Sequence, residues 1–195
     1  MIDTILENVV KMLTERKLLA PDKFNENYNK LLKQKNDERI FKIKSNFSEE
    51  EIHIMLINGK ISSIKKIQGI DAFLVNANKN KKIFIGNGIS QKAFKQFIDI
   101  DNSEVFFEYE FLMNIIDHEL QPKFELLNSE EKEIKLREYD ITLSNIPRML
   151  KTDAIARYYN AKPGDIFRII RPSAYSGLGF SYRQVVESSI QNIYN

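Results

Sequence analysis

The pattern of apolar and polar residues changes its period several times along the chain. Over 4–19 and 22–34, apolar residues recur every three or four positions, and this spacing predicts two helices. From 52 to 57 nearly every position is apolar, which is typical of a strand buried on both faces. The Asn58-Gly59 pair that follows favours a sharp turn, so we expect the strand to end there.

Helix and strand continue to alternate up to about residue 115. We predict a helix at 63–77, a strand at 81–86, a helix at 90–98 and a strand at 104–109. Gly69 weakens the first of these helices, and Ser90 is a suitable cap for the second. Alternation of this kind is typical of a sheet with helices packed against it. We therefore predict that residues 1–116 form an α/β domain, with a mixed sheet flanked by helices.

The remaining residues, 117–195, are expected to form a small α+β domain. An extended stretch interrupted by proline leads into a charged helix at 129–138, which Asn128 or Ser129 can cap. The other predicted elements are a short helix at 154–159, with Asp153 as its cap, and two strands near 166–171 and 181–187, joined by a loop that contains two glycines.

The predicted strand at 166–171 carries two arginines, Arg168 and Arg171. Because side chains alternate along a strand, the two point to opposite faces, which rules out a single basic stripe. Two interpretations remain open. Each arginine is either a peripheral residue with a buried stem and a hydrated head, or an interface residue that pairs with a carboxylate of another chain.

Composition excludes several classes of protein. The chain has 29 Lys and Arg against 27 Asp and Glu, a net charge of +2, which excludes nucleic-acid binding through bulk positive charge. Without cysteine there can be no disulfide or thiolate zinc site, and the two histidines lie far apart, so we expect no metal and no cofactor. No apolar run approaches the roughly 20 residues of a membrane helix, and the N-terminus is unlike a signal peptide, so we expect an intracellular chain without membrane contact.

Motifs for catalysis are missing from the sequence. There is no G-x-S-x-G, no glycine-rich phosphate loop and no H-E-x-x-H. A metal-dependent nuclease built on the N-terminal domain is one alternative, although it lacks the strand-borne carboxylates and lysine that such a site needs. A free-standing DNA-binding module is another, and it would bind DNA with a steep salt dependence.

A string of short motifs from His118 to Arg183 resembles the common subunit 5 of eukaryotic RNA polymerases and the shorter archaeal counterpart of that protein. Each motif is weak alone, but their order and spacing are specific. They are His118, Leu120, Pro122 and Lys123; the capped helix "NSEEKEIKL"; Ile146, Pro147 and Arg148; Asp153, Ala156, Arg157 and Tyr158; Lys162, Gly164, Asp165, Arg168, Arg171 and Ser173; and Gly177, Tyr182 and Arg183. The N-terminal part is similar to the eukaryotic form, less strongly.

The resemblance implies a non-catalytic polymerase subunit. Its N-terminal jaw domain would lie beside downstream duplex DNA, and its C-terminal assembly domain would dock on the largest subunit, near neighbouring small subunits. The implied assembly-interface residues are His118, Pro122, Lys123, Pro147, Arg148, Asp153, Arg157, Asp165, Arg168, Arg171 and Arg183. Candidates for weak contacts with DNA phosphates are Lys65, Lys66, Lys79, Lys81 and Lys82.

Heavy use of Asn, Lys and Ile indicates an AT-rich genome. Together with departures from the family pattern, such as Ala154 where proline is usual, this suggests a divergent copy. We expect a large DNA virus as its source, with an AT-rich protist as the alternative. The location would then be the nucleus or, for a viral protein, the virion and a cytoplasmic replication site.

Overall fold

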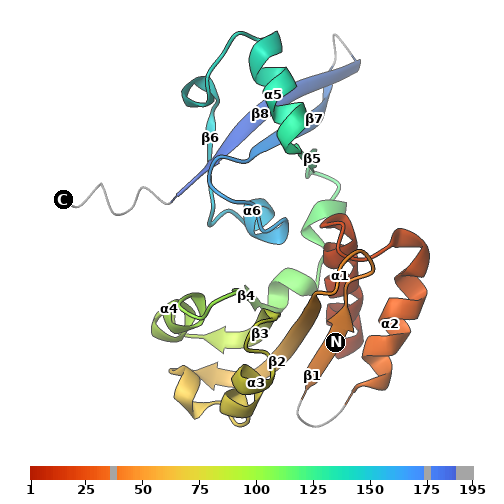
Figure 1. Cartoon of the computed structure of the whole chain (residues 1–195), viewed down its shortest axis with the longest axis vertical. Coiled ribbons are helices and arrows are strands. Elements are labelled where there is room, and N and C mark those ends of the chain that lie inside the picture. Colours follow the sequence, from red (N-terminus) through yellow and green to blue (C-terminus); the bar gives the residue numbers. More distant parts are fainter. Residues whose placement is uncertain (36–38, 174–176, 188–195) are drawn as a thin grey trace, which may run out of the picture. The chain divides into compact units, whose positions relative to one another are not determined.

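The computed structural model describes residues 1–35, 39–173 and 177–187. It divides into two compact units, Met1–Asn114 and Ile115–Asn195, each with its own four-stranded sheet (Figure 1). Both sheets are mixed, and both are flanked by helices. The chain is therefore a mixed α/β protein, while the assignment of 1–116 and 117–195 as separate domains remains a prediction.

The first unit has a sheet with helices on both faces (Figure 1). Its strands are β1 (Ile40–Lys44), β2 (Glu51–Ile61), β3 (Lys81–Ile89) and β4 (Ser103–Phe107), paired in that order. The first pair is antiparallel and the other two are parallel. The helices α1 (Ile2–Glu15) and α2 (Phe24–Lys33) lie on one side, and α3 (Ile70–Asn76) and α4 (Gln91–Ile98) on the other. Short 3-10 turns span Pro21–Lys23, Ile64–Lys66 and Glu108–Phe111.

The predicted double-sided burial of β2 is confirmed. All residues from Ile52 to Ile57 are buried, and His53, Met55 and Ile57 face the side covered by α3 and α4. Ser90 caps α4 as expected, because its side chain accepts a hydrogen bond from the Ala93 N–H at 3.2 Å.

Three local predictions in this unit are wrong. Asn58-Gly59 does not end β2, because the strand continues to Ile61. Gly59, whose φ is +78°, lies at a shift in the pairing register between β2 and β3. The helix expected over 63–77 is split, because Gly69 adopts φ +78° and α3 starts after it. The first helix ends at Glu15, since Lys17 has a positive φ of 58°.

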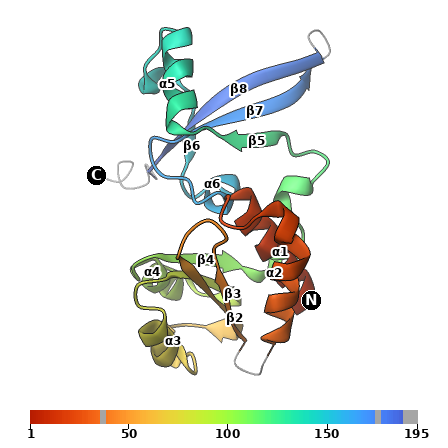
Figure 2. The same ribbon diagram turned by 45° about the vertical axis from the view of Figure 1, so that its right-hand side comes forward.

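The second unit has a sheet with one helix on each face (Figure 2). Its strand order is β5 (Lys123–Leu126), β7 (Ile166–Ser173), β8 (Gly177–Val186) and β6 (Arg148–Leu150). The pairs β5–β7 and β7–β8 are antiparallel, whereas β6 runs parallel to β8. The helices are α5 (Ser129–Glu138) and α6 (Ala154–Tyr158), and 3-10 turns span Ile115–Asp117 and Leu143–Asn145.

Local capping explains where the two helices of this unit begin. Asn128 and Glu131 form a reciprocal capping box at the start of α5, each accepting the other's backbone N–H at 2.9 Å. Asp153 accepts the Ile155 N–H at 2.9 Å and so starts α6. Both caps confirm the sequence prediction. Buried residues of α6 pack on Phe167 and Val185, and α5 covers Ile166 on the opposite face.

Candidate functional site

The β7–β8 ribbon carries several of the predicted interface residues, and its two faces differ. Residues with even numbers on both strands face α5, and those with odd numbers face α6, as the core residues Ile166 and Phe167 show. Arg168 therefore lies on the α5 face and Arg171 on the α6 face. The predicted opposition of the two arginines agrees with this arrangement.

Arg168 binds a carboxylate of its own chain. Its Nε donates to Glu125 Oε2 of the neighbouring strand β5 at 2.8 Å, and its Nη2 donates to the same oxygen. Lys123 Nζ lies 2.9 Å from the other oxygen, Oε1. An inter-chain carboxylate is thus not needed to explain Arg168, because this guanidinium ties β7 to β5; its predicted interface role stays a prediction.

The contacts among Glu125, Lys123 and Arg168 shift the pKa values of two of these groups. Hydrogen bonds from Lys123 and Arg168 lower the pKa of the Glu125 carboxyl group. The same hydrogen bond with Glu125 raises the pKa of Arg168. Both effects stabilise the charged forms, so the pair is ionised over the ordinary pH range.

Two predicted aspartates also have structural roles. Asp153 is occupied as the cap of α6. Asp165 Oδ2 accepts the Lys162 N–H at 2.7 Å, and its carbonyl accepts the Val185 N–H at 2.8 Å, which closes the turn before β7. Both carboxylates therefore already accept a backbone hydrogen bond within this chain.

The remaining predicted residues of this unit are more accessible. His118, Lys123, Pro147, Arg148, Arg171 and Arg183 are exposed, and Pro122 and Arg157 are half-buried. Arg183 Nη1 donates to the Arg148 carbonyl at 3.3 Å, which joins two of these residues across β8 and β6. Arg171 lies near the hairpin end of the ribbon, away from this pair.

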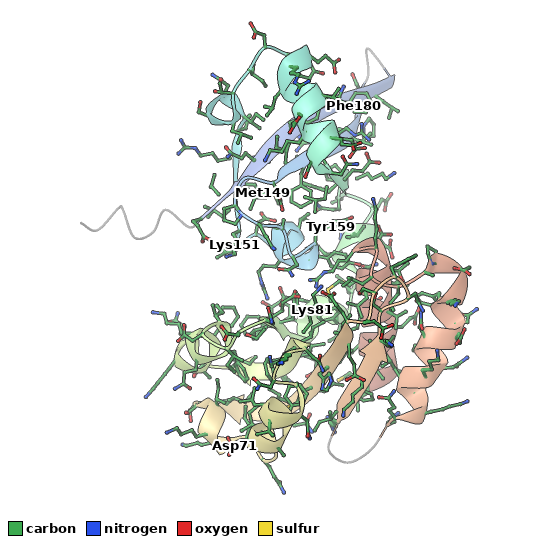
Figure 3. All side chains as sticks on the ribbon, in the orientation of Figure 1. Asp71, Lys81, Met149, Lys151, Tyr159 and Phe180 are labelled. Atoms are coloured by element: carbon green, nitrogen blue, oxygen red, sulfur yellow. The ribbon has the colours of Figure 1, made fainter. Side chains whose placement is uncertain are left out.

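Sequence reasoning missed an apolar patch at the hairpin end. We call Ile170, Pro172, Leu178 and Phe180 the hairpin patch: they are paired in register on the α5 face, beyond the part of the sheet that packs against α5. The side chains of Leu178 and Phe180 are 56% and 57% exposed. Figure 3 shows Phe180 toward the hairpin end of β8 and Met149 toward the other end of the sheet.

Contiguous exposed apolar side chains of this kind commonly mark a surface that binds another protein. The signal lies in the sequence "GLGF", where Leu178 and Phe180 alternate with glycines. The glycines favour a loop in this stretch, and that prediction is wrong, because β8 begins at Gly177. Alternation of the two apolar residues could have indicated one face of a strand.

The predicted DNA-proximal lysines do not form one surface. Lys65 and Lys66 follow the end of β2, whereas Lys79 and Lys81 lie near the start of β3. Because β2 and β3 run parallel, these two pairs lie at opposite ends of the strands, about 30 Å apart for strands of this length.

The prediction that Lys82 lies near DNA is wrong. Its side chain is buried (2% exposed), and Nζ donates to three backbone carbonyls, those of Asn78, Asn80 and Asp101, at 2.9–3.2 Å. It ties together the turns that precede β3 and β4 instead of facing solvent. Lys81 is half-buried and pairs with Glu50 at 2.7 Å. Only Lys65, Lys66 and Lys79 of the five are exposed.

Within the described residues, no group of three or more His, Cys, Asp or Glu side chains is arranged to hold a metal ion. The helices of that same part of the chain are too short or too polar to cross a bilayer.

Comparison with known proteins gives a consistent result. Residues 113–185 match the family model "RNA polymerase Rpb5, C-terminal domain". The chain is 38% identical over 133 residues to DNA-directed RNA polymerase subunit 5 of Acanthamoeba polyphaga mimivirus, an alignment that covers 68% of this chain and 64% of the relative. It is 33% identical over 127 residues to the RPABC1 subunit of RNA polymerases I, II and III of Caenorhabditis elegans, covering 63% and 60%.

An archaeal relative is matched along its full length. DNA-directed RNA polymerase subunit Rpo5 of Methanocaldococcus jannaschii is 36% identical over 78 residues, which is 100% of that protein and 40% of this chain. The chain therefore spans about three fifths of the viral and nematode relatives and all of the archaeal one.

Proposed function

The chain belongs to the RNA polymerase subunit 5 family, and from this premise we propose that it is a non-catalytic subunit of a multisubunit DNA-directed RNA polymerase that acts in assembly. The observation that carries the proposal is the match of residues 113–185, most of the second unit, to the family model, together with the archaeal relative that is matched over its full length of 78 residues. The nuclease alternative has no supporting observation: within the described residues, no group of three or more His, Cys, Asp or Glu side chains could hold a metal ion.

We propose that the hairpin patch docks on the largest polymerase subunit. The patch exposes Leu178 and Phe180 on an antiparallel ribbon. Full burial of an exposed phenylalanine contributes about 1.5–3 kcal/mol, and the gain at the 57% exposed Phe180 is correspondingly smaller. Arg171, exposed on the other face of the same ribbon, supplies a cation for a carboxylate at the rim. Neighbouring small subunits would contact the remaining exposed residues, Arg148 and Arg183 among them.

For the first unit we propose the role of a jaw near downstream duplex DNA. Weak phosphate contacts by exposed lysines at one end of the strands are sufficient for that role, because such contacts position DNA without reading its sequence. Lys65 and Lys66 are the candidates at one end and Lys79 at the other. A large DNA virus as the source is consistent with the mimivirus relative; a virion and cytoplasmic location, or a nuclear one, follows from the proposal.

A pair of matched variants tests the docking surface. Phe180→Asp places a charge in the hairpin patch, and Ile134→Asp places one at an equally exposed apolar residue of α5, 57% and 59% exposed. We expect tagged Phe180→Asp to lose most of the co-purifying largest subunit, while Ile134→Asp retains it. Circular dichroism should show both variants folded. Equal retention of the largest subunit by both variants would exclude the hairpin patch as the docking surface.

A further inference from the structure

A half-open cavity of about 270 Å³ lies in the first unit, at the end of the sheet where β2 finishes. Its apolar wall is formed by Met55, Ile57, Ile61 and Ile67, which are buried or half-buried on the side of the sheet that α3 and α4 cover. Leu56 also lines the pocket, but its side chain lies on the other face of β2. Its polar lining consists of Arg39, Asn58, Lys60, Lys66 and Gln68. The pocket is smaller than most drug-sized sites, so it suits a ligand of the size of one nucleotide or less.

The charged residues described in the lining of this pocket all have the same sign. Among the residues that the structure describes, three lining residues are cations and none is acidic. Among the described residues, no ion pair involves Arg39, Lys60 or Lys66, and Arg39 Nη1 donates instead to the neutral Asn58 Oδ1. In the same unit, by contrast, Lys35, Lys44 and Lys81 each pair with a carboxylate. Like charges that surround an apolar-walled cleft focus a positive potential into it, and a bound anion relieves their repulsion.

The cations and the apolar wall together limit the chemical class of the ligand. A carboxylate carries one charge, whereas a phosphate monoester carries up to two and offers several acceptor oxygens to three cations. A ligand that also packs against the apolar wall beside the cations must have a flat apolar part, such as a base. The amides of Asn58 and Gln68 can hydrogen-bond the edge of that base. We propose that this pocket binds a nucleoside phosphate unit, with the phosphate on Arg39, Lys60 and Lys66 and the base against the apolar wall. The inference goes beyond assembly and does not depend on it.

Titration of the isotope-labelled full chain with deoxyadenosine monophosphate, followed by NMR, tests the proposal. Amide shifts should concentrate at 55–61 and 66–68. Lys66→Glu should weaken binding by about tenfold, because a phosphate contact is replaced by repulsion. Lys23→Glu is the matched control: it makes the same charge change in an exposed lysine outside the pocket lining, and it should leave the affinity unchanged. Lys60→Glu is a second pocket variant with the same expectation as Lys66→Glu.

Parallel arms identify the source of the ligand. A single-stranded oligodeoxyadenylate that binds tighter than the mononucleotide indicates a nucleic-acid strand, and the reverse order indicates a free nucleotide. Inorganic phosphate that binds as tightly as the nucleotide would overturn the proposed base contact. Shifts spread over all exposed lysines, an equal loss in Lys23→Glu, or tighter binding of an acidic peptide would overturn the proposal itself. Co-purification of the polymerase is a separate readout, so failure of either proposal can be told from failure of the other.

Discussion

Replacement of Lys82 by methionine should destabilise the first unit by about 2 kcal/mol. The methionine keeps the length and the apolar stem but removes three charge-assisted hydrogen bonds to backbone carbonyls at 2.9–3.2 Å. Each buried acceptor left without a donor costs about 1–3 kcal/mol. Water can reach carbonyls in exposed turns, and the buried ammonium is no longer desolvated, so the net loss is smaller than the sum.

Hydrogen exchange of the β3 peptide measures this loss selectively, because exchange reports the opening of each segment by itself. A change of about 2 kcal/mol corresponds to roughly 30-fold faster exchange through unfolding. Lys79→Met is the matched control, since Lys79 is exposed, and it should change exchange less than twofold or so. If Lys82→Met exchanges like the wild type, the buried lysine does not hold these turns together and the reasoning is refuted.

Three other variants probe both units. Hydrogen bonds from Lys123 and Arg168 lower the folded-state pKa of Glu125, so its carboxylate stabilises the second unit above the unfolded-state value of 4.5, and this contribution is lost as pH falls through the lower folded pKa. Melting temperature should therefore fall more on acidification in the wild type than in Glu125→Gln. Asn128→Ala should lose about 1 kcal/mol in urea denaturation, because the capping box is removed. Gly59→Ala should lose about 1 kcal/mol in the same assay, owing to its φ of +78°; an unchanged midpoint would contradict the bulge geometry.

Local features were predictable from the sequence because their causes lie within a few residues. The caps at Ser90, Asn128 and Asp153 and the burial of 52–57 needed only spacing and residue type. Short edge strands are harder: β6 has three residues, and only its pairing with β8 makes it a strand.

Partners across the sheet were not predictable. Glu125 and Arg168 are 43 residues apart in sequence, so nothing local indicates that an arginine expected at an interface is bound within the chain. Nothing in "KNKK" distinguishes Lys82 from the other two lysines, and only the strand phase of β3 together with the Asp101 carbonyl explains its burial. The basic pocket draws residues from 39 to 68 across three segments and has no sequence motif.

The most direct test of the central claim is affinity purification of the tagged full chain from cells that make its polymerase, with quantitative mass spectrometry. The account predicts recovery of the largest polymerase subunit in about equal amount with this chain at gentle salt. Recovery of the chain without any large polymerase subunit would contradict it.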